Sequence, residues 1–326
     1  MKNCLGLIIL LLFIFSACAT HFHLDFLGKS KIQEVVLMES PQKEKLLVVD
    51  LTGTIQSIKS PGLLNREGDP VSSIYYRLKR ASEDPLVKGI ILRLDTPGGE
   101  ATASDIIYHE ILMFKEKTGI PVVALMMGVA ASGGYYVASA CDYIIAHPTT
   151  ITGSIGVIAI IPNFNKIMSR LGIKVNVIKS GRMKDAGSPF REMSFEEKAY
   201  FQSLIDAMYE NFLQVVYQNR KEKLSMEAIQ SLADGRVYIA QKALDLKLID
   251  EIGYFESALK KTLDLAKITD ADVVAYSYYP QRKTNIYASS ASNNSSLKLE
   301  IKGLDQVIPN LKPGIYYLWL PTLEQE

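Results

Sequence analysis

The serine best suited to nucleophilic chemistry is Ser132, within the stretch 126–142 (MMGVAASGGYYVASACD). The apolar run 121–125 before it predicts a buried parallel strand, and the apolar segment 135–140 after it predicts a helix. Two glycines directly after the serine allow a sharp bend and the close approach of a second chain. The first turn of a helix also offers unpaired N–H groups. This arrangement suits attack on a carbonyl whose oxygen becomes negative, although a plain turn between strand and helix has the same composition.

A nucleophilic serine needs a base, and the choice among the basic residues is narrow. The chain has four histidines, His21, His23, His109 and His147. The best of them is His147, which precedes a proline at the end of a predicted strand. A lysine is the alternative, because burial disfavours the ammonium form and leaves a neutral amine. Lys184 lies in a glycine-flanked loop, 179–189, although this setting also suits a solvated lysine. A nearby carboxylate would favour the ammonium, so the side chain of Asp185 is expected to point away from Lys184.

Two further loops follow predicted strands and carry small residues. The first, 95–100 (DTPGGE), contains Gly99, and its backbone N–H groups are free to point at a ligand, as an oxyanion hole requires. The second, 152–156 (TGSIG), contains Ser154. Turns of this composition are also common where no function is involved.

Strands that alternate with helices predict an α/β fold with a parallel sheet. Strands are expected at 46–51, 87–94, 121–127, 143–146 and 175–178. Helices are expected at 69–81, 103–117, 226–233 and 240–248, and after the capping-box pair Ser194 and Glu197. In a parallel sheet the carboxyl ends of the strands lie at one edge, so the three loops would meet there.

The composition of the chain argues against several classes of protein. Lys plus Arg number 36 against 35 for Asp plus Glu, so no basic excess indicates nucleic-acid binding. The three cysteines are Cys4, Cys18 and Cys141. No pair has the spacing of metal ligands, and the sequence contains no phosphate-binding loop, so neither a metal nor another cofactor is expected.

The N-terminal segment predicts export and attachment to a membrane. Lys2 precedes an apolar run, 5–15, that is short for a transmembrane helix and typical of a signal peptide. The sequence Phe-Ser-Ala-Cys that ends at Cys18 resembles the lipobox of bacterial lipoproteins, in which the cysteine is lipidated after cleavage. We therefore expect residues 1–18 to be a signal peptide of lipoprotein type or an uncleaved anchor. Residues 19–45 are then a linker, and the body lies on the extracytoplasmic side of a membrane.

Four motifs together resemble those of the signal peptide peptidase A family of Ser/Lys proteases, which is related in fold to Clp protease and the crotonases. They are DTPGG at 95–99, ASGGYYVA at 131–138, TGSIGV at 152–157 and SGRMKDAGSPFR at 180–191. The resemblance implies that Ser132 is the nucleophile and Lys184 the general base. It further implies that Gly99 donates an oxyanion N–H and that Ser154 hydrogen-bonds the lysine. One departure, Asp-Thr at 95–96 where the family often has Asn-Ser, touches no catalytic atom.

The resemblance also sets expectations for the fold, the assembly and the substrate. It implies a Clp protease/crotonase-like superhelix of repeated β-β-α units in a protease domain, 46–265, with a helical extension for oligomerisation and a C-terminal extension, 266–326. It implies a homo-oligomeric ring, an octamer by analogy, and in some members the lysine comes from a neighbouring subunit. The implied activity is that of a serine endopeptidase that degrades cleaved signal peptides and other apolar extended peptides at the membrane. Two alternatives stay open: a crotonase-like enzyme acting on acyl-coenzyme A, and an inactive membrane-tethered scaffold.

Overall fold

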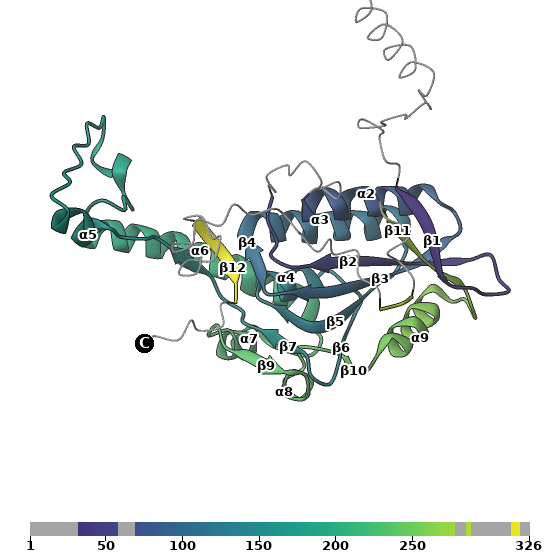
Figure 1. The fold of residues 1–326 in the computed structure, drawn as a ribbon. Coiled ribbons are helices and arrows are strands. Elements are labelled where there is room, and N and C mark those ends of the chain that lie inside the picture. Colours follow the sequence, from purple (N-terminus) through teal and green to yellow (C-terminus); the bar gives the residue numbers. More distant parts are fainter. Residues whose placement is uncertain (1–31, 58–68, 278–284, 288–313, 320–326) are drawn as a thin grey trace, which may run out of the picture. The chain divides into compact units, whose positions relative to one another are not determined.

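A nine-stranded sheet forms the centre of the computed structural model, which describes residues 32–57, 69–277, 285–287 and 314–319 (Figure 1). Its strands are β1 (Gln33–Met38), β2 (Lys45–Thr52), β3 (Val87–Thr96), β5 (Val122–Ala131), β6 (Tyr143–Ala146), β7 (Ile151–Gly153), β9 (Val237–Ile239), β10 (Glu251–Ile252) and β11 (Asp272–Ser277). The main path runs β1-β11-β2-β3-β5-β6-β10. Strands β11 to β10 along this path pair in parallel, and β1 is antiparallel at the edge. Strand β7 pairs in parallel with the last residues of β5 and antiparallel with β9.

Both faces of the parallel strands are buried, which explains why they read as continuous apolar runs. Helices α2 (Pro70–Glu83) and α3 (Ala101–Thr118) cover one face, and α9 (Phe255–Ala266) covers the other (Figure 1). Successive side chains of β2 alternate between the two faces. Leu47 and Val49 pack in the cluster that contains Ile74 of α2, whereas Val48 packs with Phe255 of α9.

A smaller antiparallel sheet lies beside the main one. It has the order β4-β12-β8 and consists of β4 (Gly98–Glu100), β8 (Ile158–Ile160) and β12 (Gly314–Leu318). Strand β4 follows β3 after a single residue, so this small sheet begins where the central strand β3 ends. The apolar C-terminal stretch that forms β12 therefore packs on the body of the protein, with Tyr316, Tyr317 and Leu318 buried.

The long helix α6 (Phe195–Arg220) begins at the predicted capping box. Ser194 accepts a hydrogen bond from the Glu197 N–H at 3.2 Å, and the Glu197 carboxylate accepts one from the Ser194 N–H at 2.8 Å. The C-terminal half of α6 buries Phe212, Leu213 and Val216 in the core. Helices α7 (Met226–Leu232) and α8 (Ala240–Asp245) follow it.

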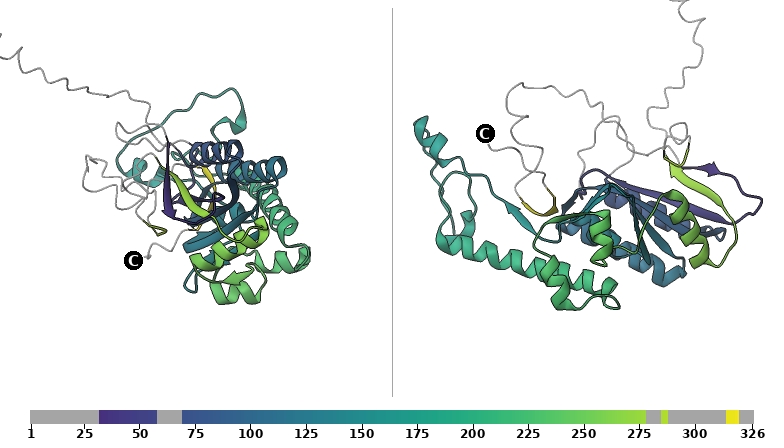
Figure 2. Two further views of the ribbon diagram at one scale, coloured as in Figure 1. Left: turned by 90° about the vertical axis from the view of Figure 1, so that its right-hand side faces the viewer. Right: turned by 90° about the horizontal axis from the view of Figure 1, so that it is seen from below.

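Residues 161–194, here called the arm, connect β8 to α6. The arm contains α5 (Asn165–Arg170) and the 3-10 turn η1 (Arg182–Asp185). Figures 1 and 2 show it at the end of α6 that is farthest from the sheet. Most side chains of residues 163–184 are exposed.

The α/β fold with a mainly parallel sheet is confirmed, together with the helices expected from periodicity. The strand expected at 175–178 is wrong, because its alternating residues lie exposed on the arm and pair with no strand among the described residues. The loops expected at 95–100 and 152–156 are partly strand, namely β4 and β7. The expected linker, 19–45, contains β1. Within the described residues, no helix combines the length and apolar character needed to span a bilayer.

Candidate active site

Ser132 stands at the junction between β5 and the short helix α4 (Gly133–Ala138), with a backbone conformation that L-residues rarely adopt. Its φ is 51° and its ψ is −113°, and such strain costs on the order of 1–3 kcal/mol. Its N–H donates to the Gly153 carbonyl at 2.8 Å, and its carbonyl accepts from the Tyr136 N–H at 2.8 Å. These bonds hold the turn in place. Ser132 is buried, with 1% of its surface exposed. Among the described residues the Ser132 hydroxyl makes no hydrogen bond.

Glycines from two loops lie against each other beside Ser132, and their lack of a side chain is required. A Cβ on Gly98 would meet the Gly133 nitrogen at 2.6 Å. A Cβ on Gly99 would meet the Ile55 carbonyl oxygen at 2.0 Å. The loop that carries Gly99 and the helix start that follows Ser132 are therefore in direct contact, as the sequence predicts for three loops at one edge of a parallel sheet.

Strand β12 passes directly over these glycines. Tyr317 is paired with Gly99 in the antiparallel register of β12 and β4. The Tyr317 carbonyl oxygen lies 2.1 Å from the position of a Cβ on Gly98 and 3.0 Å from that of a Cβ on Gly133. The ring of Tyr317 stacks on Tyr136, with 5.1 Å between ring centroids. The edge of β4 thus accepts an extended segment whose carbonyl faces the glycines next to Ser132.

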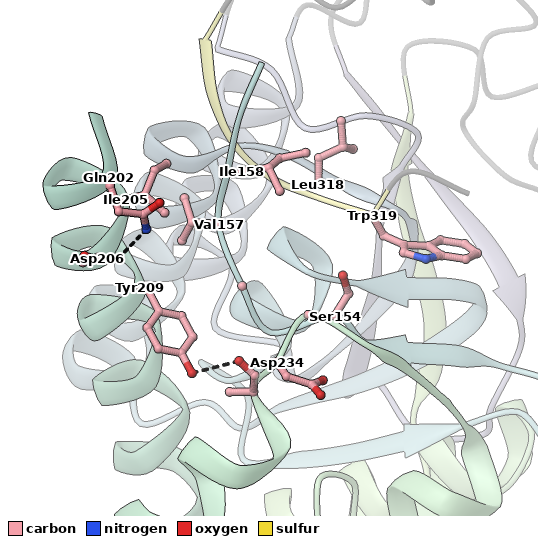
Figure 3. Close-up of a pocket in the computed structure, with 13 residues that line it drawn as sticks. Ser154, Val157, Ile158, Gln202, Ile205, Asp206, Tyr209, Asp234, Leu318 and Trp319 are labelled. Carbon is pink, nitrogen blue, oxygen red and sulfur yellow. Dashed lines mark hydrogen bonds between the residues drawn. The ribbon is translucent and has the colours of Figure 1, made fainter. Parts of the chain in front are cut away.

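Ser154 also adopts a positive φ, of 50°, and lies directly after β7. Its N–H donates to the Arg236 carbonyl at 2.8 Å. The Ser132–Gly153 hydrogen bond places its backbone next to that of Ser132. Its side chain lines a pocket of about 460 Å³ between α6 and the ends of β8 and β12 (Figure 3). This pocket also presents Val157, Ile158, Leu318 and Trp319.

Lys184 lies in η1 on the arm and is exposed. Figure 1 shows the arm far from α4, and no hydrogen bond or ion pair among the described residues joins Lys184 to Ser132. The single chain thus brings Ser132, Gly99 and Ser154 together and leaves Lys184 apart from them.

The carboxylate of Asp185 is bound by two cations and makes no ion pair with Lys184 among the described residues. Arg191 donates from Nε to Oδ2 and from Nη2 to Oδ1, both at 2.9 Å, and Lys179 binds Oδ1 as well. Hydrogen bonds from Arg191 and then Lys179 hold the pKa of Asp185 well below its usual range. Asp185 itself lies in the 3-10 turn η1, and its two partners lie on either side of this turn in the chain. Sequence reasoning did not single out Arg191.

Among the described residues no histidine is hydrogen-bonded to Ser132, and His21 and His23 lie outside the described residues. His109 is exposed on α3, as expected for a helix-surface residue. His147 follows β6, and its Nδ1 lies 3.2 Å from the Gly253 carbonyl oxygen. Burial lowers the pKa of His147. Cys141 is buried, and burial raises the pKa of its thiol to about 12. Cys18 lies outside the described residues, which contain no cluster of metal-ligating side chains.

Comparison with known proteins agrees with a peptidase site. The model of peptidase family S49 matches residues 115–269, which include Ser132, Ser154 and Lys184. A protein of Enterococcus faecium that carries the name signal peptide peptidase SppA is 35% identical over 269 residues, 82% of this chain and 76% of the relative. Protease 4 of Haemophilus influenzae is 36% identical over 68% of this chain and 35% of the relative. The chloroplastic serine protease SPPA of Arabidopsis thaliana is 29% identical over 72% of this chain and 34% of the relative.

These matches, with the buried glycines that pack beside the strained serine, define a serine peptidase. The chain belongs to the signal peptide peptidase A family. This assignment favours peptidase chemistry over the crotonase-like and scaffold alternatives.

Proposed function

We propose that the protein is a Ser/Lys-dyad endopeptidase in which Ser132 of one copy works with Lys184 of a neighbouring copy in a homo-oligomeric ring. The observation that carries the proposal is the separation of the two residues: Ser132 is held in a strained turn in the body, whereas Lys184 lies exposed on the arm. A dyad needs its two groups within hydrogen-bond reach. A second copy that lays its arm against the body supplies the missing amine without unfolding either chain.

The pocket beside Ser154 is the entry route for that amine. Its lining includes the buried Ser154 (Figure 3), whose backbone lies next to that of Ser132 through the Ser132–Gly153 hydrogen bond. Enclosure of Lys184 in this pocket removes water from the ammonium and favours the neutral amine, whereas the carboxylates of Asp206 and Asp234, which also line the pocket, favour the ammonium. The Ser154 hydroxyl then hydrogen-bonds and orients the Lys184 Nζ.

The reaction is hydrolysis of a peptide bond through an acyl-enzyme. Neutral Lys184 removes the proton of Ser132 Oγ as this oxygen attacks the carbonyl carbon. The Gly99 N–H and the Gly133 N–H stabilise the oxyanion of the tetrahedral intermediate. The lysine ammonium gives its proton to the leaving amine as the C–N bond breaks. Lys184 then removes a proton from water, which attacks the acyl group and releases the acid.

The substrate is an extended, apolar peptide, such as a cleaved signal peptide. Strand β12 supports this substrate class, because it already pairs with β4 and directs a carbonyl toward Gly98 and Gly133. A substrate strand that replaces β12 at this edge makes main-chain hydrogen bonds regardless of its sequence. Strand β12 is itself apolar, with Tyr316, Tyr317 and Leu318 buried, so a substrate strand of similar character fits the same place.

Complementation of two inactive variants tests the shared site. Ser132→Ala and Lys184→Ala proteins, each inactive alone, are mixed under conditions that allow subunit exchange. A mixed ring contains interfaces where an intact Ser132 meets an intact Lys184, so activity on an apolar fluorogenic peptide returns. A matched mixture of Ser132→Ala with the double variant Ser132→Ala/Lys184→Ala contains no intact serine and stays inactive. Mixed oligomers that form and remain inactive would place the dyad within one chain.

We also propose that the body is extracytoplasmic and held at a membrane through its N-terminal segment, with lipid on Cys18. The small residues before Cys18 and the short apolar run support this attachment. Radiolabelled palmitate should mark the wild-type protein and not Cys18→Ala. A wild-type protein that takes up no label and keeps residues 1–17 would favour an uncleaved anchor.

A further inference from the structure

We propose that Arg191 is a positioning residue for the general base: it holds the Asp185 carboxylate against the start of α6 and so keeps that negative charge away from Lys184. This inference rests on the proposed role of Lys184. Arg191 itself touches neither substrate nor the reacting atoms in this proposal.

Arg191 connects two carboxylates through one guanidinium. It binds both oxygens of Asp185 at 2.9 Å, and its Nη2 also donates to the Asp185 backbone carbonyl at 2.9 Å. On its other side, Nη1 donates to Glu197 Oε2 at 2.8 Å, and Nη2 contacts Glu197 Oε1. A planar guanidinium suits this double bidentate geometry, which a lysine cannot reproduce.

Glu197 is the fixed end of this connection. Its side chain is 4% exposed, and its Oε2 also accepts the Ser194 N–H in the capping box of α6. The hydrogen bond from Arg191, with that from the Ser194 backbone, lowers the pKa of Glu197 to about 2. Arg191 therefore fastens the turn that carries Lys184 to the first turn of a 26-residue helix.

The turn itself is too short to hold its orientation alone. Lys184 N–H donates to the Gly181 carbonyl at 3.1 Å, and Ser188 N–H donates to the Asp185 carbonyl at 3.0 Å. Gly187 between them has a φ of +75°. The contacts of Arg191 with Asp185 and Glu197 add side-chain attachments between this turn and α6.

The charged groups around Asp185 show why the loss of Arg191 would matter. Lys179 binds the same carboxylate and also donates to the Arg182 carbonyl. Arg182 is itself paired with Glu196 at the surface, where both side chains are largely exposed. Without Arg191, the Asp185 carboxylate is held only by Lys179 and can turn toward Lys184. Glu197 also loses its counter-charge. A carboxylate near Lys184 stabilises the ammonium form, so a higher pH is needed to free the base.

The test is the pH dependence of kcat/KM for the full-length enzyme on an apolar fluorogenic peptide. Arg191→Gln should move the acid limb upward by about one pH unit, because a neighbouring opposite charge changes protonation equilibria by that order. At pH values on that limb, kcat/KM should fall about tenfold. Arg182→Gln, which removes an arginine and an ion pair from the same turn, is the matched control and should leave the limb in place.

A second substitution separates charge control from simple anchoring. Asp185→Asn/Arg191→Gln has no carboxylate to release, so its acid limb should return to the wild-type position. The inference would be overturned if the acid limb of the double variant were as displaced as that of Arg191→Gln. It would also be overturned if Arg191→Gln had the wild-type pH profile. Arg191→Lys keeps the charge without the bidentate contacts and should give an intermediate shift. If Arg191→Gln does not assemble, Arg191→Lys takes its place in the test. A wild-type pH profile for Arg191→Lys would then overturn the inference.

The proposed function and this inference fail in different ways. If Lys184→Ala kept substantial activity, Lys184 would not be the general base, and the proposed function would be rejected. An inactive Lys184→Ala enzyme combined with an unshifted Arg191→Gln profile would leave the dyad intact and reject only the role of Arg191.

Discussion

The backbone N–H of Ser132 donates to the carbonyl of Gly153 at 2.8 Å, which joins the end of β5 to the end of β7. Ser132 and Ser154 directly follow these two strands, and both have a positive φ. The hydrogen bond between the strand ends therefore places their backbones side by side.

Replacement of Ser132 tests both its chemistry and its strain. Ser132→Ala and Ser132→Gly should each lower kcat/KM by on the order of 10³-fold or more, because both remove the nucleophile. Glycine tolerates the positive φ of this position, so Ser132→Gly should be more stable than Ser132→Ala by about 1 kcal/mol. Thermal unfolding measures the difference. Activity near wild type in either variant would contradict the assignment of the nucleophile.

Substitution of Gly99 should disrupt the site through packing. A Cβ there would meet the Ile55 carbonyl oxygen at 2.0 Å, so Gly99→Ala should destabilise the protein by about 3 kcal/mol and abolish activity. Gly119→Ala is the control: unlike Gly99, Gly119 has a positive φ, but a Cβ there would meet no atom within 4 Å. It should cost about 1 kcal/mol and leave kcat/KM unchanged. Equal losses of stability in chemical denaturation would contradict the packing argument.

The ion pairs of the arm should be sensitive to acid. The pKa of Glu197 falls from an ordinary value near 4.5 to about 2 because of Arg191 and the Ser194 backbone. A carboxylate with a lowered pKa stabilises the folded arm fully above its ordinary pKa, and this contribution is lost as the pH falls from about 4.5 through 2. A carboxyl-carbon NMR titration should locate the Glu197 transition near pH 2 and, in Arg191→Gln, closer to 4.5. A wild-type transition near 4.5 would show that the ion pair does not persist in solution.

The buried ion pair between Arg220 and Asp250 should stabilise the packing of α6 on the body. Arg220 Nη1 lies 2.6 Å from Asp250 Oδ1, and both side chains are at most 5% exposed. Burial alone would raise the pKa of Asp250, but Arg220 and Lys223 hold it below its usual range. Arg220→Met leaves a buried carboxylate with only Lys223 as counter-charge and should cost about 3 kcal/mol in urea unfolding.

The exposed pair of Arg236 and Asp234 supplies the comparison for this prediction. Arg236→Gln should change the free energy of unfolding by less than about 1 kcal/mol. A loss for Arg220→Met no larger than that for Arg236→Gln would mean that the buried pair adds nothing to stability.

The sequence predicts the parallel sheet well because its strands are buried on both faces and separated by amphipathic helices. The run 87–94 and the helix 103–117 appear almost as expected, as β3 and α3. The convergence of the loops that contain Ser132, Gly99 and Ser154 also follows from parallel topology alone. Strands β4 and β7 could not be predicted, because segments of three residues, Gly-Gly-Glu and Ile-Thr-Gly, are too short to show periodicity.

Contacts distant in sequence account for the other differences. Strand β12 pairs with β4 across more than 200 residues, and no local pattern in its aromatic sequence identifies that edge. The alternation at 175–178 is typical of a strand, yet a strand needs a neighbour, and on the arm none is present among the described residues. The position of Arg191 follows from the fold of the turn, which sequence spacing does not determine.

Trp319 is the single tryptophan of the chain, and it lines the pocket beside Ser154 (Figure 3). The indole emission of the whole protein therefore originates at this one position. An arm or a peptide that fills the pocket would change the surroundings of Trp319 and with them its emission. Stopped-flow fluorescence of the unlabelled protein can thus time the filling of the pocket separately from the cleavage that follows.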